Sequence, residues 1–197
     1  ITNNISGGSI TVYPTAMTSG SCGGVFFGGY NAVTTEKAVN NISGGEIVVR
    51  CKKGVQGSVF MGGENNCTIG TLQNNVSGGA FLFYPADESV TTGYSSASGI
   101  YMASYIGRIK TELQNNITGG LFDVTPIGTG MISFSGQGLN TYIKKLVNTI
   151  GVEGTDIGPV FLGNNVHMGG TWGKNGVDGT ITAQPDKTSL SSMSDTV

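Results

Sequence analysis

Carboxylates are the side chains of this sequence most able to do chemistry, because paired acids can hydrolyse a polysaccharide. Such pairs stand about 5–10 Å apart on one face of a site. The candidates here are Asp87, Glu88, Asp123, Glu153 and Asp156. No two of them fall at equivalent positions of the repeat described below, so stacking of repeats would not bring a pair together. We expect solvated surface acids and assign no catalytic residue.

A metal centre or a histidine-based nucleophilic site would depend on His167, the single histidine of the chain. It stands in NNVHMGGTWGKNGVDG (164–179) with Trp172, the single tryptophan. No cysteine or second histidine lies at ligand spacing from it. The recurring GG pairs lack the following helix and lysine of a phosphate-binding loop. We therefore expect no metal and no cofactor, and interpret 164–179 as an irregular cap or docking element.

The three cysteines, Cys22, Cys51 and Cys67, show neither the CxxC spacing of a zinc site nor an even-numbered disulfide framework. One disulfide with one thiol left over and three buried thiols are both compatible with this spacing. We favour three buried thiols.

N-glycosylation is a further chemistry for which the sequence offers acceptors. The candidate asparagines, each in an N-x-S/T triplet, are Asn4, Asn41, Asn66, Asn75 and Asn116. Glycans on four of them would form a stripe along one edge of the repeat array. If these asparagines are structural instead, they point inward, or one of each Asn pair points in and the other out.

Composition excludes several classes of partner. The 197 residues carry a net charge of −2, only 11% are charged, and 34 are glycine. Without a basic patch, nucleic acid and anionic membrane are poor partners. No apolar run is long enough to cross a bilayer, and the start lacks the pattern of a signal peptide. The chain begins without Met, so we expect it to be processed, excised or truncated.

One hexapeptide recurs through the chain and organises it. The copies are NNISGG (3–8), NNISGG (40–45), NNVSGG (74–79) and NNITGG (115–120), with a weaker fifth starting at Asn148. An alternating segment follows each GG: 9–14, 46–51, 80–85 and 121–126. Period-two alternation predicts strands with one buried face.

Two further segments complete each repeat. The second segments (23–29, 57–63, 99–105 and 130–136) are rich in β-branched and aromatic residues, which predicts strands. Aromatics here, such as Phe26 and Phe60, should alternate between faces, the outer ones packing against a loop. A third segment, as in 105–114 or 141–147, leads into the next Asn pair. Length varies only between the GG and the second segment, which predicts variable loops on one face.

The Asn pair and the glycines are expected to form a corner of each repeat. Asparagine tolerates the left-handed conformation of a bend, and its amide can bond to the amide of the next repeat. The glycines would supply positive φ at the following corner. The residues predicted to build this corner are Asn41, Asn75, Asn116, Gly44, Gly45, Gly78, Gly79, Gly119 and Gly120.

These repeats predict an all-β fold, a parallel β-helix (β-solenoid) of about 4–5 rungs with three strands per rung. The solenoid domain would cover residues 1–170, with repeats starting near 3, 40, 74, 115 and 148, and 171–197 would be a polar tail or docking extension. Stacked asparagines at a turn resemble the parallel β-helix proteins, which include surface adhesins, phage tailspikes and pectin-degrading enzymes. A β-propeller and a β-prism-like repeat are the alternatives.

We expect a structural, non-catalytic subunit of an extracellular, cell-surface or virion fibre. It would form a homo-oligomer or filament through uncapped solenoid ends or strand donation, without nucleic acid and without membrane insertion. The alternative, implied by the resemblance, is a polysaccharide-binding or -depolymerising module, with carbohydrate as the partner. That module needs acidic or aromatic clusters at stacked positions, which we do not expect from this sequence.

Overall fold

The computed structural model describes residues 1–13, 22–89, 93–95, 98–137, 141–152, 158–163, 165–168 and 195–196. The strands of its larger sheet are β1 (Thr2–Val12), β3 (Thr34–Cys51), β5 (Thr68–Pro85), β7 (Arg108–Asp123), β9 (Tyr142–Ile143), β10 (Leu146–Ile150), β11 (Val160–Leu162) and β13 (Asp195–Thr196). The smaller sheet contains β2 (Cys22–Phe26), β4 (Gln56–Phe60), β6 (Gly99–Tyr101), β8 (Met131–Ser133) and β12 (Asn165–His167). A short 3-10 turn, η1 (Thr125–Ile127), follows β7.

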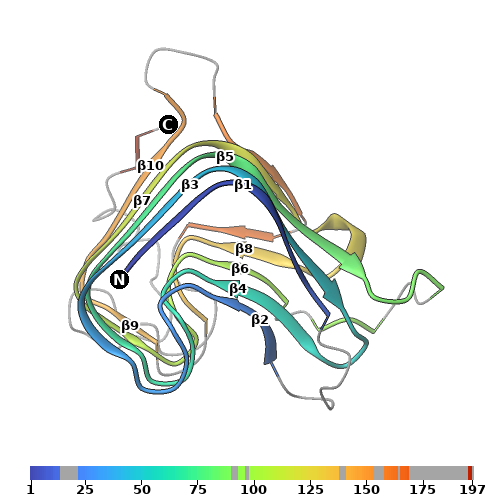
Figure 1. Ribbon diagram of the computed structural model, residues 1–197, viewed down its shortest axis with the longest axis horizontal. Coiled ribbons are helices and arrows are strands. Elements are labelled where there is room, and N and C mark those ends of the chain that lie inside the picture. The colour runs from blue at the N-terminus through green and yellow to red at the C-terminus, as the bar shows by residue number, and fades with distance from the viewer. Residues whose placement is uncertain are drawn as a thin grey trace.

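Successive sequence repeats lie side by side in both sheets (Figure 1). The larger sheet has the order β1-β3-β5-β7-β10-β13, and the smaller has the order β2-β4-β6-β8-β12. The strand pairs in the described part of the chain are parallel. The fold is therefore all-β with parallel sheets, which is compatible with the expected β-solenoid. The antiparallel blades of the β-propeller alternative do not occur among these pairs.

The register joins equivalent positions of the repeats. Asn3 pairs with Asn40, then Asn40 with Asn74, Asn74 with Asn115, and Asn115 with Asn148. The five repeats are thus β1–β2, β3–β4, β5–β6, β7–β8 and β9–β12. Each hexapeptide marks the same position in its own repeat, directly beside the hexapeptides of the neighbouring repeats.

The corner is displaced from where the sequence analysis put it. The Asn pair lies inside a continuous strand, because the third segment and the following first strand merge into the long strands β3, β5 and β7. The register shifts instead at the serine and glycines, between Ile42 and Glu46 in β3. Left-handed asparagines do occur, at Asn31, Asn65 and Asn66, but in turns outside the hexapeptide.

The two glycines of each hexapeptide have different tasks. The second glycine takes positive φ, +81° at Gly45 and +85° at Gly79, which L residues rarely adopt. The first glycine lies against the preceding repeat: a Cβ on Gly78 would stand 2.6 Å from the carbonyl oxygen of Ser43. Gly119 meets Ser77 in the same way. Both glycines are required for successive repeats to stack at the bend.

The core consists of columns of equivalent residues, one from each repeat. Ile10, Ile47, Phe81, Phe122 and Phe161 form one column through the larger sheet. The rings of Phe81 and Phe122 stack with centroids 4.8 Å apart, and both are fully buried. A second cluster contains Ala38, Leu72, Leu113 and Leu146, the apolar residues two positions before each Asn pair. These four side chains are buried, whereas Ile1, two positions before Asn3, is 46% exposed.

Candidate functional site

The first asparagine of each pair belongs to a column of side-chain amides, which we call the inner ladder: Asn3, Asn40, Asn74, Asn115 and Asn148. The Nδ2 of each donates to the Oδ1 of the next at 2.8 Å, from Asn3 through to Asn148. The four members after Asn3 are completely buried. Burial of polar groups without partners costs free energy, so this ladder requires an amide in every repeat.

The second N–H of each inner amide ties the two sheets together. Nδ2 donates to the backbone carbonyl just after the smaller-sheet strand of the same repeat: Phe27, Met61, Met102, Phe134 or Met168, at 2.7–3.2 Å. Asparagine supplies two donors and one acceptor, which matches the two acceptors and one donor around it. The carbonyl also determines the amide orientation, because only the NH₂ group can donate to it. The recurrence of the hexapeptide follows from this clamp.

The second asparagine of each pair forms an outer ladder of Asn4, Asn41, Asn75 and Asn116. Asn41 Nδ2 donates to Asn4 Oδ1, Asn75 to Asn41, and Asn116 to Asn75, at 2.8–2.9 Å. These side chains are exposed or partly exposed. Donation runs toward β1 in the outer ladder and toward β10 in the inner ladder, so the two amide chains have opposite polarity.

The acceptor asparagines for N-glycosylation divide into two environments. Asn4, Asn41, Asn75 and Asn116 are the outer ladder, and three of them donate through Nδ2, the atom that would carry the sugar. Asn66 stands apart in a turn with φ +65°, exposed, and its Nδ2 is 3.4 Å from Asn65 Oδ1. Glycosylation stays a prediction. Among the described residues, Asn66 Nδ2 makes only a long hydrogen bond and Asn4 Nδ2 makes none, whereas the other three Nδ2 atoms each donate at 2.8–2.9 Å.

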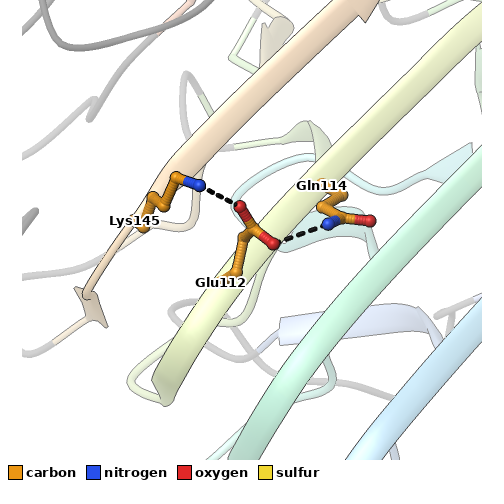
Figure 2. Close-up of polar contacts among 3 residues, drawn as sticks. All are labelled: Glu112, Gln114 and Lys145. Atoms are coloured by element: carbon orange, nitrogen blue, oxygen red, sulfur yellow. Dashed lines mark hydrogen bonds and ion pairs between the residues drawn. The ribbon is translucent and has the colours of Figure 1, made fainter.

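An ion pair links two repeats on the same outward face as the outer ladder. Lys145 Nζ lies 2.6 Å from Glu112 Oε1, and Glu112 Oε2 accepts from Gln114 Nε2 at 2.5 Å (Figure 2). The hydrogen bond from Lys145 is the main reason that the pKa of Glu112 is lowered. Glu112, Gln114 and Asn116 alternate along β7, so this face presents polar groups to solvent.

A buried carboxylate lies beside the smaller sheet. Glu64 is 7% exposed, and its buried Oε2 has no hydrogen-bond partner among the described residues. Burial raises the pKa of Glu64. Its backbone bridges to Tyr30 in one neighbouring repeat and to Tyr105 in the other, and Tyr105 bridges in turn to Gln137. These four residues form one column across four repeats, which we call the Glu64 column.

Aromatic rings also stack on the outward side of the smaller sheet. Phe60 and Tyr101 have centroids 4.8 Å apart, and Phe26 lies 5.9 Å from Phe60. Our expectation that stacked aromatics are absent is therefore wrong. Phe60 and Tyr101 are fully buried, however, so those two rings present no sugar-binding strip.

The acids singled out from the sequence have separate environments. Asp87 Oδ1 accepts from the backbone N–H and hydroxyl of Ser89, and these hydrogen bonds lower the Asp87 pKa. Asp123 makes the same local contacts with Thr125. Glu88 is exposed, and Glu153 and Asp156 lie outside the described residues. Asp87 and Asp123 are thus held in local turns of their own, unlike the convergent acids that glycoside hydrolysis requires.

Histidine and cysteine occupy structural positions in the described part of the chain. His167 is partly buried in β12, and its carbonyl accepts from Phe134 N–H at 2.8 Å. Cys51 and Cys67 are buried free thiols, and burial raises the pKa of Cys51 to about 12. The side chain of Cys22, residue Trp172 and most of 171–197 lie outside the described residues. Where side chains are described, no three His, Cys, Asp or Glu residues gather as metal ligands.

No family model matches the chain, and comparison with curated proteins and with solved structures likewise finds no match. Within the described ranges, none of the helical structure is long and apolar enough to span a bilayer.

The sequence analysis assigned the stacking to Asn41, Asn75 and Asn116, which form the outer ladder, and left open that one Asn of each pair points inward. It did not identify the first Asn of each pair as the inward one. A signal was present. Strand alternation puts residues two apart on one face, so Leu72, Asn74 and Val76 share the buried face. The Glu64 column gave no comparable signal, because its members differ from repeat to repeat.

Proposed function

We propose that this chain is a structural, non-catalytic β-solenoid subunit of an extracellular, cell-surface or virion fibre. Parallel in-register repeats and two amide ladders support the solenoid. Its subunits associate with one another through the ends of the repeat stack. Most of the described acids and thiols are buried or held in local turns. This favours a structural protein over an enzyme.

The position of the exposed apolar side chains carries this proposal. In the described part of the chain, the large hydrophobics that are at least 40% exposed are Ile1, Ile10, Tyr13, Tyr30, Val152, Val160, Leu162 and Val166. All eight belong to the first or the last repeat. Ile10 and Val166 end core columns whose middle members are buried. Apolar surface confined to the two ends favours burial of those ends against another molecule.

Analytical ultracentrifugation with electron microscopy tests the proposal. We expect reversible, concentration-dependent association of the wild-type chain and elongated particles in the micrographs. Ile10→Asp and Val166→Asp, which put a charge on either end, should leave monomers. Ser77→Asp, in the middle repeat, is the matched control and should associate like wild type. A wild-type protein that stays monomeric at every concentration overturns the proposal.

A carbohydrate-binding module is the second candidate, and the Glu64 column favours it. Tyr30 is 60% exposed beside Glu64 in this column and offers an aromatic ring on which a sugar could stack, whereas the unpartnered Glu64 oxygen is buried. Titration calorimetry with oligosaccharides would detect such binding. Binding heat that disappears in Tyr30→Ala supports this candidate, and no heat with any sugar rejects it.

A further inference from the structure

The ladders make the two ends of the stack different from one another and complementary. β1 is an edge strand of the larger sheet, and among the described residues neither the acceptor Asn3 Oδ1 nor the donor Asn4 Nδ2 has a hydrogen-bond partner. At the β10 end, the described residues hold no sixth asparagine to which Asn148 Nδ2 could donate. Thr149, opposite Asn116 in β10, offers a hydroxyl that can accept. The β1 end therefore presents acceptor then donor. At the β10 end Asn148 is completely buried and paired with Asp195 of β13, and this end would present donor then acceptor once β13 leaves.

Resting on the proposed function, we infer that copies join head to tail, with β1 of one copy pairing in parallel with β10 of the next. The register is fixed by the ladders: Asn3 lies opposite Asn148 and Asn4 opposite Thr149. Head-to-head pairing would place acceptor against acceptor in the inner ladder. The opposite polarity of the two ladders thus selects a polar filament.

The same register buries the apolar ends. Pairing within the chain places Ile10 and Phe161 in one column, and Val25 and Val166 in another. In the joint, Ile10 of one copy therefore covers Phe161 of the next, and Val25 covers Val166. Ile10 is 41% and Val166 43% exposed, and their partners Phe161 and Val25 are partly buried, so both columns would continue from one copy into the next.

Strand β13 occupies part of this joint in the single chain. It pairs with β10 at only two positions, Asn148 with Asp195 and Thr149 with Thr196. Within the chain, by contrast, β10 pairs with β7 at five positions, which is its full length. An incoming β1 therefore offers the β10 end a longer partner than β13, which is displaced when copies join.

A charge exchange across the joint tests this inference. Asn4→Asp keeps the acceptor for Asn41 Nδ2 but replaces the outward donor with an acceptor, so each copy should associate at least about tenfold more weakly. Thr149→Lys puts a donor opposite the Asn4 donor and should weaken association similarly. Mixing the two variants places the introduced carboxylate of one copy opposite the introduced ammonium of the next, and association should be restored. Expression in bacteria keeps glycans out of the comparison.

The outcomes separate this inference from the proposal beneath it. Wild-type association that neither variant weakens, or that mixing fails to restore, overturns the β1–β10 joint while leaving self-association in place. A monomeric wild type overturns both. Unfolding of each variant in urea, compared with wild type, shows whether the single chain keeps its fold.

Discussion

Asparagine is required in the inner ladder because of its hydrogen-bonding capacity. Asn74 accepts from Asn40 and donates to both Asn115 and the Met102 carbonyl, all out of contact with water. Aspartate has the same shape but no N–H, and leucine has neither donor nor acceptor. The outer asparagines make similar bonds at the surface, where water can replace a lost partner.

Replacing Asn74 and its neighbour Asn75, one at a time, compares how much an inner and an outer asparagine contribute to the free energy of unfolding. Asn74→Asp buries a charge and leaves two acceptors without donors, so we expect a loss of roughly 3–5 kcal/mol in unfolding free energy. Asn75→Asp, the matched surface variant, should lose only about 0.5–1.5 kcal/mol. Urea denaturation at neutral pH provides both values. Equal losses would show that the inner amides are not the clamp between the sheets.

Glu64 should make stability depend on pH in the opposite sense to an ion-paired acid. Its pKa is raised from 4.5 by burial, so the folded chain binds the proton more tightly than the unfolded chain. Its stabilising contribution is complete below 4.5 and is lost as pH rises through the folded pKa. Glu64→Gln cannot ionise, and we expect it to be more stable than wild type at about pH 8 but not at about pH 4.

Glu112→Gln is the control for that pH series. The pKa of Glu112 is lowered, mainly by the Lys145 hydrogen bond, so its contribution is present above 4.5 and lost as pH falls through the lowered pKa. This variant should therefore lose stability near pH 8 and match wild type in acid. The midpoint of urea unfolding is measured at both pH values for both variants. If raising the pH changes the stability of both variants relative to wild type in the same direction, the raised pKa assigned to Glu64 is wrong.

The strands show how far sequence pattern alone predicts this fold. Alternation predicted the strand segments and their inward residues, because burial of one face is a local property. It could not show that Thr34–Cys51 is continuous, since strand and bend both tolerate an Asn pair. The position of the bend is determined by glycine, because Gly78 lies so close to the Ser43 carbonyl of the preceding repeat that a side chain would not fit. That contact exists only once repeats are stacked.

The candidate site was less predictable than the fold. The recurrence of asparagine indicated stacking, but the carbonyl partners such as Met61 and Met102 follow loops of different length and share no sequence signal. Glu64 stands in a column with two tyrosines and a glutamine. Only the parallel register brings those four residues together.

β13 supplies a prediction about the end of the larger sheet. If it holds the edge of β10 until another copy arrives, Thr196→Pro, which removes a backbone N–H from β13, should promote association. Measured by sedimentation, the protein concentration at which half of the chains are associated should be lower for this variant than for wild type. Thr2→Pro removes an N–H from β1 instead and should act in the opposite direction. A Thr196→Pro variant that associates more weakly than wild type would show that β13 is part of the joint.

In the described part of the chain, the large hydrophobic residues that are at least 40% exposed and the two end members of the inner ladder lie in the first and the last repeat. The ladder amides of the repeats between them are satisfied by their neighbours. If copies join as proposed, complementary and non-identical ends would add repeats along one direction without closing on themselves, which would give a fibre.

The axial rise per subunit in such a fibre distinguishes this account from others. The larger sheet contributes five repeats, β1, β3, β5, β7 and β10, between one joint and the next. At about 4.8 Å per strand, the account predicts a rise of roughly 24 Å with all subunits pointing one way, measured by electron cryo-microscopy. A rise one strand longer would mean that β13 stays in the joint. Subunits of alternating direction, or particles that never exceed a monomer, would contradict the account.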